Sequence, residues 1–180
     1  MPSEHAGETP ATRTETMNKK VTNVVVAGLG GQGVLKASDI LADAAFLAGL
    51  SVKKSEIHGM SQRGGSVSSD VRFGSEVYSP MVPPGEADYL VILSADQVAP
   101  NQHMLAEGGM LIEPKAIDES KLTNKKSLNV AILGVLSSYL DISPEHWRQA
   151  IRNALSAKLH EANLQAFEIG RSRGQEMKGE

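Results

Sequence analysis

The sequence predicts an α/β fold, a single Rossmann-like domain whose mixed, mostly parallel sheet has helices on both faces. Short apolar runs typical of buried strands alternate along the chain with amphipathic segments of helical period. The first of these runs leads through a glycine-rich turn into the first helical segment, as in the opening of a βαβ unit. The length of 180 residues corresponds to about one domain.

The first βαβ elements have the clearest pattern. The continuous apolar run at 24–27 indicates a strand that is buried on both faces of a parallel sheet. After the glycines, apolar residues recur at helical spacing over 34–48, while Lys36, Asp39 and Asp43 occupy the opposite side. Gly49 is well placed to end this helix.

The rest of the chain continues the alternation of strands and helices. Alternating side chains at 66–73 predict a half-solvated, antiparallel strand, and Pro83 and Pro84 place a loop after it. We expect further strands at 51–54, 89–93 and 110–112, a short helix at 97–105, an irregular stretch at 115–128 and longer helices at 130–140 and 144–159. Gly134 costs its helix about 1 kcal/mol unless another group must approach closely there.

The chain divides into three parts by composition. Residues 1–20 are polar and rich in Glu, Thr and Pro, and we expect a disordered tail there, with Met17 as an alternative start. Residues 21–170 form the predicted domain. We expect residues 171–180 to fray.

Composition excludes several classes of chemistry. Without cysteine, this chain alone supplies no thiolate nucleophile, no disulfide and no cysteine ligand for zinc or an iron–sulfur cluster. A net charge of −3 with scattered Lys and Arg, and only one Trp, three Tyr and three Phe, argues against a nucleic-acid partner. No apolar run approaches the ~20 residues that span a bilayer, and no signal peptide is evident, so we expect a cytoplasmic protein without a membrane partner.

The first candidate site is the turn Gly28-Leu29-Gly30-Gly31-Gln32-Gly33. It matches the G-x-G-x-x-G pattern between a predicted strand and a predicted helix. Such a turn directs unpaired N–H groups at an anion, aided by the positive end of the helix dipole. A dinucleotide site would also need an acidic residue ~20 positions on, for which Glu56 is the only near candidate. The turn therefore binds a phosphate or carboxylate, binds a nicotinamide dinucleotide, or merely packs the helix tightly on the sheet.

The second candidate site is the segment that runs from Glu56 to Gly65. Arg63 offers a planar fork for an anionic group, and Gly64 and Gly65 allow the backbone to approach a ligand or a partner. His58 is either a general base or a structural histidine, and the segment as a whole could be a surface turn in which Arg63 pairs with Glu56. The histidines at 5, 58, 103, 146 and 160 lack the spacing of metal ligands, so we expect no metal site.

Together these two segments resemble the gamma-type domain of 2-oxoacid:ferredoxin oxidoreductases. The resemblance rests on G-x-GGQGV at 28–34 and E-x-HGMSQRGG at 56–65, with further similarity at 129–134 (NVAILG) and at N-x-x-AF-x-x-G, 163–170. It spans nearly everything from residue 24 to residue 170. Within the family, the form HGMSQRGG is similar to the indolepyruvate branch, whereas the pyruvate type tends to carry Tyr-Gly and an acidic residue before Arg-Gly-Gly.

The resemblance implies a non-redox subunit of an enzyme that decarboxylates a 2-oxoacid oxidatively to an acyl-CoA. It places thiamine diphosphate and [4Fe–4S] clusters on an alpha subunit, which passes electrons to ferredoxin. It implies that the turn containing Gly30, Gly31, Gln32 and Gly33 accepts the phosphates of coenzyme A. The second segment, with Arg63 and in a supporting role His58, would then face the alpha subunit.

Two other functions and a wider range of substrates stay open at this stage. One alternative is a free-standing Rossmann oxidoreductase that binds NAD or NADP. The other is a purely architectural subunit that touches no cofactor. Pyruvate and other 2-oxoacids are alternative substrates to an aryl pyruvate.

Overall fold

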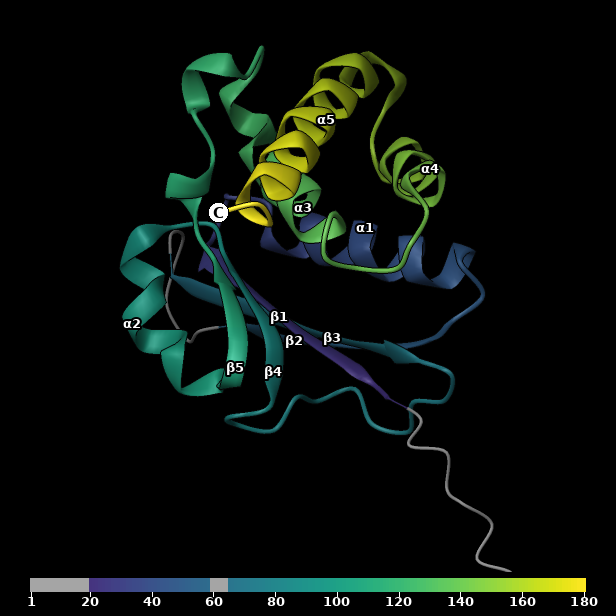
Figure 1. Cartoon of the computed structure of the whole chain (residues 1–180), viewed down its shortest axis with the longest axis vertical. Helices are drawn as coiled ribbons and strands as arrows, with labels where there is room; N and C mark the ends of the chain where they lie inside the picture. Colours follow the sequence, from purple (N-terminus) through teal and green to yellow (C-terminus); the bar gives the residue numbers. More distant parts are fainter. Residues whose placement is uncertain (1–19, 59–64) are drawn as a thin grey trace, which may run out of the picture.

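A computed structural model describes residues 20–58 and 65–180, which form one α/β domain built on a five-stranded sheet (Figure 1). The strands lie in the order β2-β3-β1-β4-β5. Their bounds are β1 Thr22–Leu29, β2 Ser51–His58, β3 Ser66–Gly74, β4 Ala87–Ile92 and β5 Leu105–Ile112. Residues 1–19 of the tail expected at 1–20 lie outside the described residues.

The sheet is mixed, as the sequence predicts. β1 pairs in parallel with β4, and β4 in parallel with β5. β3 lies antiparallel between β1 and β2, so parallel and antiparallel pairs occur in equal number, whereas the sequence predicts mostly parallel pairs. Residues Val24 to Ala27 are at most 1% exposed, which agrees with the apolar run expected at the centre of the sheet.

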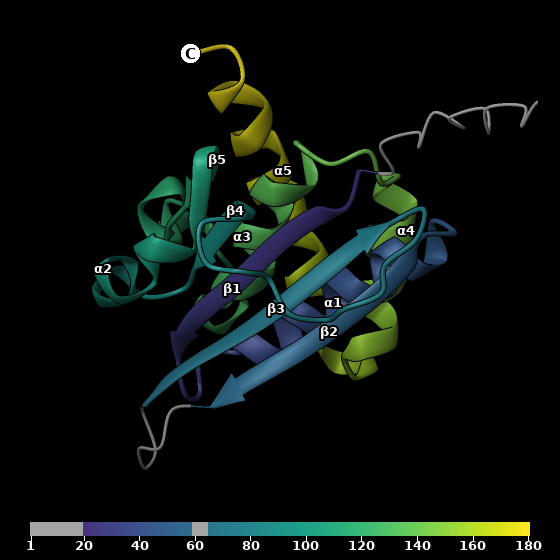
Figure 2. The same cartoon turned by 90° about the horizontal axis from the view of Figure 1, so that it is seen from below.

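Helices cover the two faces of the sheet unequally. The four longer helices, α1 (Val34–Leu47), α3 (Leu128–Ser137), α4 (Pro144–Ala154) and α5 (His160–Met177), lie on one side (Figures 1 and 2). Their apolar side chains form the main core with Val24 and Val26 of β1. The opposite face carries Val25 and Ala27, which pack with the short helical segment 95–104 that contains α2 (Val98–Asn101) and with Val82 of the loop 75–86.

A close contact between α3 and α5 explains the glycine inside α3. A Cβ at Gly134 would lie 2.2 Å from the carbonyl oxygen of Phe167, and a Cβ at Gly170 would lie 1.7 Å from that of Ala131. The two helices therefore approach backbone to backbone, which confirms that Gly134 accommodates a close neighbour. Phe167 of α5 in turn stacks on Trp147 of α4, with ring centroids 5.9 Å apart.

The C-terminal third differs from the prediction in its helix boundaries. The helix expected at 144–159 ends at Ala154, because Leu155 adopts an extended conformation, and a second helix, α5, begins at His160. Ser143 caps α4 as expected, accepting a hydrogen bond from the N–H of Glu145. The second helix, α5, continues through 171–177, where we expected fraying. Within the described residues, no helix is long and apolar enough to cross a bilayer.

The second face of β3 is covered rather than solvated. β3 is antiparallel to both of its neighbours, as predicted. However, Asp70, which we expected on a solvated face, is only 2% exposed, and its carboxylate accepts a hydrogen bond from the N–H of Val82. Arg72, on the same face, donates to the carbonyl of Ser79. These contacts hold the loop 75–86 against the sheet (Figure 2).

Candidate functional site

The glycine turn lies at the carboxyl end of β1. The connections that leave β1 and its neighbour β4 run over opposite faces of the sheet. From β1 the chain crosses one face through α1 to reach β2, and from β4 it crosses the opposite face through α2 to reach β5. The carboxyl ends of the neighbouring parallel strands β1 and β4 thus form a topological switch point. Ligands of open α/β sheets bind in the crevice at such a point.

The backbone of the turn leaves N–H groups available. Gly31 and Gly33 have φ values of 89° and 81°, which favour glycine. Gly33 is the N-cap of α1, and the first turn of this helix has no acidic side chain. Among the described residues, the N–H groups of Gly31, Gly33 and Val34 have no hydrogen-bond acceptor. The positive end of α1 therefore presents free donors to an anion.

Three other predicted ligands of the turn are engaged within the protein. The N–H of Gly30 donates to the carbonyl of Gly65 at 2.8 Å, and the side-chain oxygen of Gln32 accepts from the N–H of Leu29 at 2.7 Å. A Cβ on Gly28 would lie 2.8 Å from that Gln32 oxygen. Gly28, Gly30 and Gln32 thus shape the turn, and Gln32 also lines the pocket beside it. Gly31 and Gly33 are the members whose N–H groups face outward.

The structure brings the two glycine-rich segments together. The hydrogen bond from Gly30 to Gly65 joins the turn after β1 to the start of β3. The β2–β3 hairpin therefore ends beside the candidate anion site, although the two segments are separated by about thirty residues in the sequence. Arg63, Gly64 and the side chain of His58 lie outside the described part of the chain.

A pocket of about 370 Å³ adjoins the outward face of the turn. Its lining includes Gly31, Gly33 and Asn129, together with the exposed lysines Lys125 and Lys126. The Asn129 amide donates to the carbonyl of Gly33 and so ties α3 to the turn. Two cations beside free backbone donors make this pocket suited to phosphate.

Sequence reasoning missed the two lysines. They belong to a 3₁₀ turn, Lys125–Ser127, inside the stretch that we expected to be irregular. A hydrogen bond from the N–H of Lys126 to the Asn124 side chain caps this turn immediately before α3. The available signal was the adjacent pair Lys125-Lys126 close before Asn129, a residue of the NVAILG segment.

An apolar pocket of about 430 Å³ lies on the other side of the same turn. Its lining combines Gly30, Gly31 and Gly33 with the side chains of Leu29, Val34, Leu35, Lys36 and Val67. Val67 belongs to β3, so this pocket extends toward the hairpin that contains the second segment. The glycine turn therefore separates a cationic pocket from an apolar one.

Glu56 does not take the place that a dinucleotide site requires. β3 lies between β2 and β1, so the strand that carries Glu56 is not adjacent to the strand that ends in the glycine turn. The Glu56 carboxylate also forms an ion pair with Lys54 at 2.6 Å. Burial lowers the pKa of Lys54, but its hydrogen bonds to Asp39 and Glu56 outweigh burial and raise it. Glu56 is thus engaged by a firmly protonated lysine.

The described residues contain no group of three or more His, Cys, Asp or Glu side chains that could hold a metal ion. The residues of the site are therefore backbone donors, two lysines and apolar side chains. Such a set can bind and orient an anionic ligand.

Comparison with known proteins identifies the family. Residues 23–173 match the pyruvate ferredoxin/flavodoxin oxidoreductase family. The chain is 35% identical to the indolepyruvate oxidoreductase subunit IorB of Thermococcus kodakarensis, with 89% of this chain and 99% of the relative covered. It is 34% identical to the IorB subunit of Pyrococcus horikoshii, with 88% and 98% covered.

Solved structures show the same fold. The gamma subunit of a keto/oxoacid ferredoxin oxidoreductase from Geobacter sulfurreducens superposes with a TM-score of 0.75 at 21% identity, covering 87% of this chain and 98% of that one. A 2-oxoglutarate:ferredoxin oxidoreductase from Magnetococcus marinus, solved with 2-oxoglutarate, coenzyme A and succinyl-CoA bound, gives a TM-score of 0.72 at 20% identity, covering 88% of this chain and 32% of that one. The chain belongs to the pyruvate ferredoxin/flavodoxin oxidoreductase family, and its curated relatives are subunits of oxidoreductases that act on 2-oxoacids.

Proposed function

We propose that this chain is the beta subunit of an indolepyruvate-type 2-oxoacid:ferredoxin oxidoreductase, that it is inactive alone, and that its glycine turn receives coenzyme A. In this proposal the alpha subunit supplies thiamine diphosphate and the [4Fe–4S] clusters and passes electrons to ferredoxin. The absence of cysteine from this chain is consistent with that division, since the chain cannot supply thiolate ligands to a cluster. The named substrate of the relatives at 34–35% identity, indolepyruvate, favours an aryl pyruvate.

The pair of pockets around the glycine turn carries the proposal. Coenzyme A joins a polyanionic nucleotide to a long uncharged arm that ends in a thiol. The cationic pocket with Lys125 and Lys126 suits the phosphates, which the free N–H groups of Gly31 and Gly33 would bind. The apolar pocket suits the arm. A protein of the same fold has been solved with coenzyme A bound, which supports this class of ligand.

The direction of the ligand follows from this arrangement. With its phosphates beside the lysines, coenzyme A would run across the glycine turn and direct its thiol past Val67 toward the β2–β3 hairpin. The second segment, with His58, Arg63, Gly64 and Gly65, connects β2 to β3 in the sequence. We propose that it faces the alpha subunit near the acyl-thiamine intermediate, where Arg63 orients an anionic group and His58 has a supporting role. On this basis Arg63→Ala should greatly reduce turnover of the assembled complex and leave the fold intact.

Co-expression with the alpha subunit tests the function. Ferredoxin reduction should require both subunits, coenzyme A and a 2-oxoacid, with indolepyruvate used in preference to phenylpyruvate and pyruvate. If pyruvate were the only one of the three 2-oxoacids to support ferredoxin reduction, the protein would belong to the pyruvate branch of the family. Ferredoxin reduction by this chain without the alpha subunit would refute the division of labour.

Binding of coenzyme A and NADH to the isolated chain distinguishes the proposed function from the two alternatives, a free-standing Rossmann oxidoreductase and a purely architectural subunit. The chain should bind coenzyme A and show no response to NADH in calorimetric titrations. Micromolar binding of NADH without binding of coenzyme A would favour a free-standing Rossmann oxidoreductase. A purely architectural subunit would bind neither ligand.

A further inference from the structure

A second large depression lies at the opposite end of the sheet from the glycine turn. It has a volume of about 630 Å³ and is formed by the start of β1, the start of β4, residues 106–110 of β5 and the segment 139–142 that follows α3. Because β1 and β4 are parallel, their amino ends meet here while their carboxyl ends meet at the glycine turn. We call this depression the amino-end groove.

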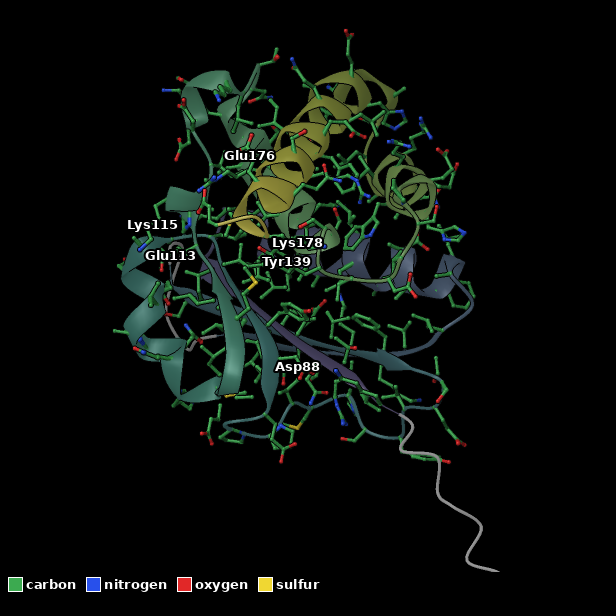
Figure 3. All side chains as sticks on the ribbon, viewed as in Figure 1. Asp88, Glu113, Lys115, Tyr139, Glu176 and Lys178 are labelled. Atoms are coloured by element: carbon green, nitrogen blue, oxygen red, sulfur yellow. The ribbon has the colours of Figure 1, made fainter. Side chains whose placement is uncertain are left out.

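The base of the amino-end groove is apolar and held in place. Phe73, Tyr89 and Met110 line it, and Phe73 is only 4% exposed. The hydroxyl of Tyr89 donates to the carbonyl oxygen of Tyr139 at 3.4 Å. The Lys178 ammonium lies 5.2 Å from the centre of the Tyr139 ring, and Figure 3 shows the two side by side.

Three carboxylates surround this base, and the described residues give them no cationic partner. Glu107 and Asp141 are exposed, and neither makes an ion pair within the described part of the chain. Asp88, at the start of β4 (Figure 3), accepts a hydrogen bond from the backbone N–H of Asn23 and forms no ion pair with a described residue. Lys20 is the one cation among the described lining residues. Other acidic side chains differ, since Glu145 and Glu168 both pair with Arg148.

The lining has the properties of a contact surface rather than of a built small-molecule site. Among the described residues, the buried side-chain atoms without a hydrogen-bond partner belong to His146 and Trp147, and neither residue lines the groove. Among the described residues that line the groove, every buried side-chain polar atom thus has a hydrogen-bond partner within the protein. What the groove offers is a firm apolar base inside a negatively charged rim.

We propose that the amino-end groove docks a segment of the alpha subunit that presents a Lys or Arg side chain. The aliphatic stem of that side chain would lie on Tyr89 and Met110, and its cationic end would reach Glu107, Asp141 and Asp88. Charge complementarity selects this occupant, because a neutral or acidic segment would leave the carboxylates unpaired or repel them. The inference rests on the proposed function for the existence of an alpha subunit.

The experiment reverses two rim charges in the full chain and measures assembly with the alpha subunit. Glu107→Lys/Asp141→Lys should raise the dissociation constant of the complex about tenfold or more, because attraction becomes repulsion. The control, Glu119→Lys/Glu161→Lys, changes net charge equally at two exposed carboxylates away from the groove and should leave the constant unchanged. Thermal unfolding of each variant should show an intact fold.

The possible outcomes distinguish the two proposals. Equal dissociation constants for the groove variant and the control would overturn the docking site while leaving the subunit function standing. A wild-type chain that does not bind the alpha subunit would instead refute the proposed function. If the groove variant assembles normally but alters self-association in sedimentation, a second copy of this chain occupies the groove, and the inference is wrong.

Discussion

At the scale of single residues, the members and neighbours of the glycine turn have two roles. Some stabilise its backbone, and others leave space for a ligand. Gln32 and Asn129 brace the glycine turn from inside, through Leu29 and Gly33 respectively. Gly31 has open space around the position of its absent Cβ, whereas a Cβ at Gly33 would lie 2.5 Å from the Asn129 amide nitrogen. One turn thus contains a glycine required by packing and another that keeps the pocket clear.

Asp70 gives a residue-scale prediction. Burial raises the pKa of its carboxyl above the usual 3.8, although the N–H of Val82 and the charge of Arg72 oppose the rise. The folded state therefore binds the proton more tightly than the unfolded state, and this group lowers stability as pH increases from near 3.8 through the raised pKa. Asp70→Asn keeps an acceptor for Val82 and removes the charge, so its stability relative to the wild type should increase over that window.

Urea unfolding of both proteins across the acidic range measures this difference. Asp118→Asn is the control, because hydrogen bonds from Ser120 lower the pKa of Asp118 and give a trend of opposite sign. If the difference in the free energy of unfolding between Asp70→Asn and the wild type did not vary with pH, the raised pKa of Asp70 would be contradicted.

At the scale of elements, the contact between α3 and α5 fixes the position of the C-terminal helix. Gly170→Ala would improve the intrinsic helix propensity of α5 by about 1 kcal/mol. However, its new Cβ would lie 1.7 Å from the Ala131 carbonyl oxygen, so the helices must separate. We expect a net loss of about 3 kcal/mol in the free energy of unfolding.

Chemical denaturation measures that loss, with Gly179→Ala as the control because its Cβ would meet only Glu176 O, at 3.4 Å. Equal stability of the two variants would show that α3 and α5 adjust to each other easily. The α3–α5 contact would then not be the reason for glycine at 134 and 170.

The elements also show how far sequence reasoning reaches. The apolar run at 24–27, the alternation at 66–73 and the Ser143-Pro144 cap were sufficient to predict β1, β3 and the start of α4, because burial, period and capping are local signals. The strand order was not predictable, since β3 inserts between β2 and β1 through long-range pairing. The burial of Asp70 depends on the loop 75–86 folding back, which its own strand pattern does not reveal.

The candidate site shows the same division. The motif at 28–33 was sufficient to predict an anion site at the start of α1, because glycine and helix-start signals are local. Which glycines face outward depends on Gly65 and Gln32 occupying their neighbours, and the two lysines come from a segment almost a hundred residues away. Tertiary structure alone brings these groups to the turn.

At the scale of the whole molecule, the two ends of the sheet have different properties. Beside the carboxyl ends of β1 and β4 lie the backbone donors of the glycine turn and two lysines. Beside their amino ends lie three carboxylates that form no ion pair within the part of the chain that the structure describes. α3 connects the two, with Asn129 at the glycine turn and Tyr139 just beyond its end at the amino-end groove. The proposals assign coenzyme A to the first end and the alpha subunit to the second.

The proposed division of labour between the subunits predicts the properties of the isolated chain. The purified chain, which contains no cysteine, should be colourless and should not reduce ferredoxin. Adding the alpha subunit should restore reduction that depends on both coenzyme A and the 2-oxoacid. An iron–sulfur spectrum from the isolated chain would be incompatible with the proposed division between the subunits.

The most direct test of the coenzyme A site is the KM for coenzyme A of the assembled complex carrying Lys125→Ala/Lys126→Ala. Loss of charge-assisted contacts to phosphate should raise this KM about tenfold or more, with the KM for the 2-oxoacid unchanged. Lys121→Ala, an exposed lysine outside the site, serves as the matched control and should behave as the wild type. A wild-type KM for coenzyme A in the double variant would contradict the placement of its phosphates at the glycine turn.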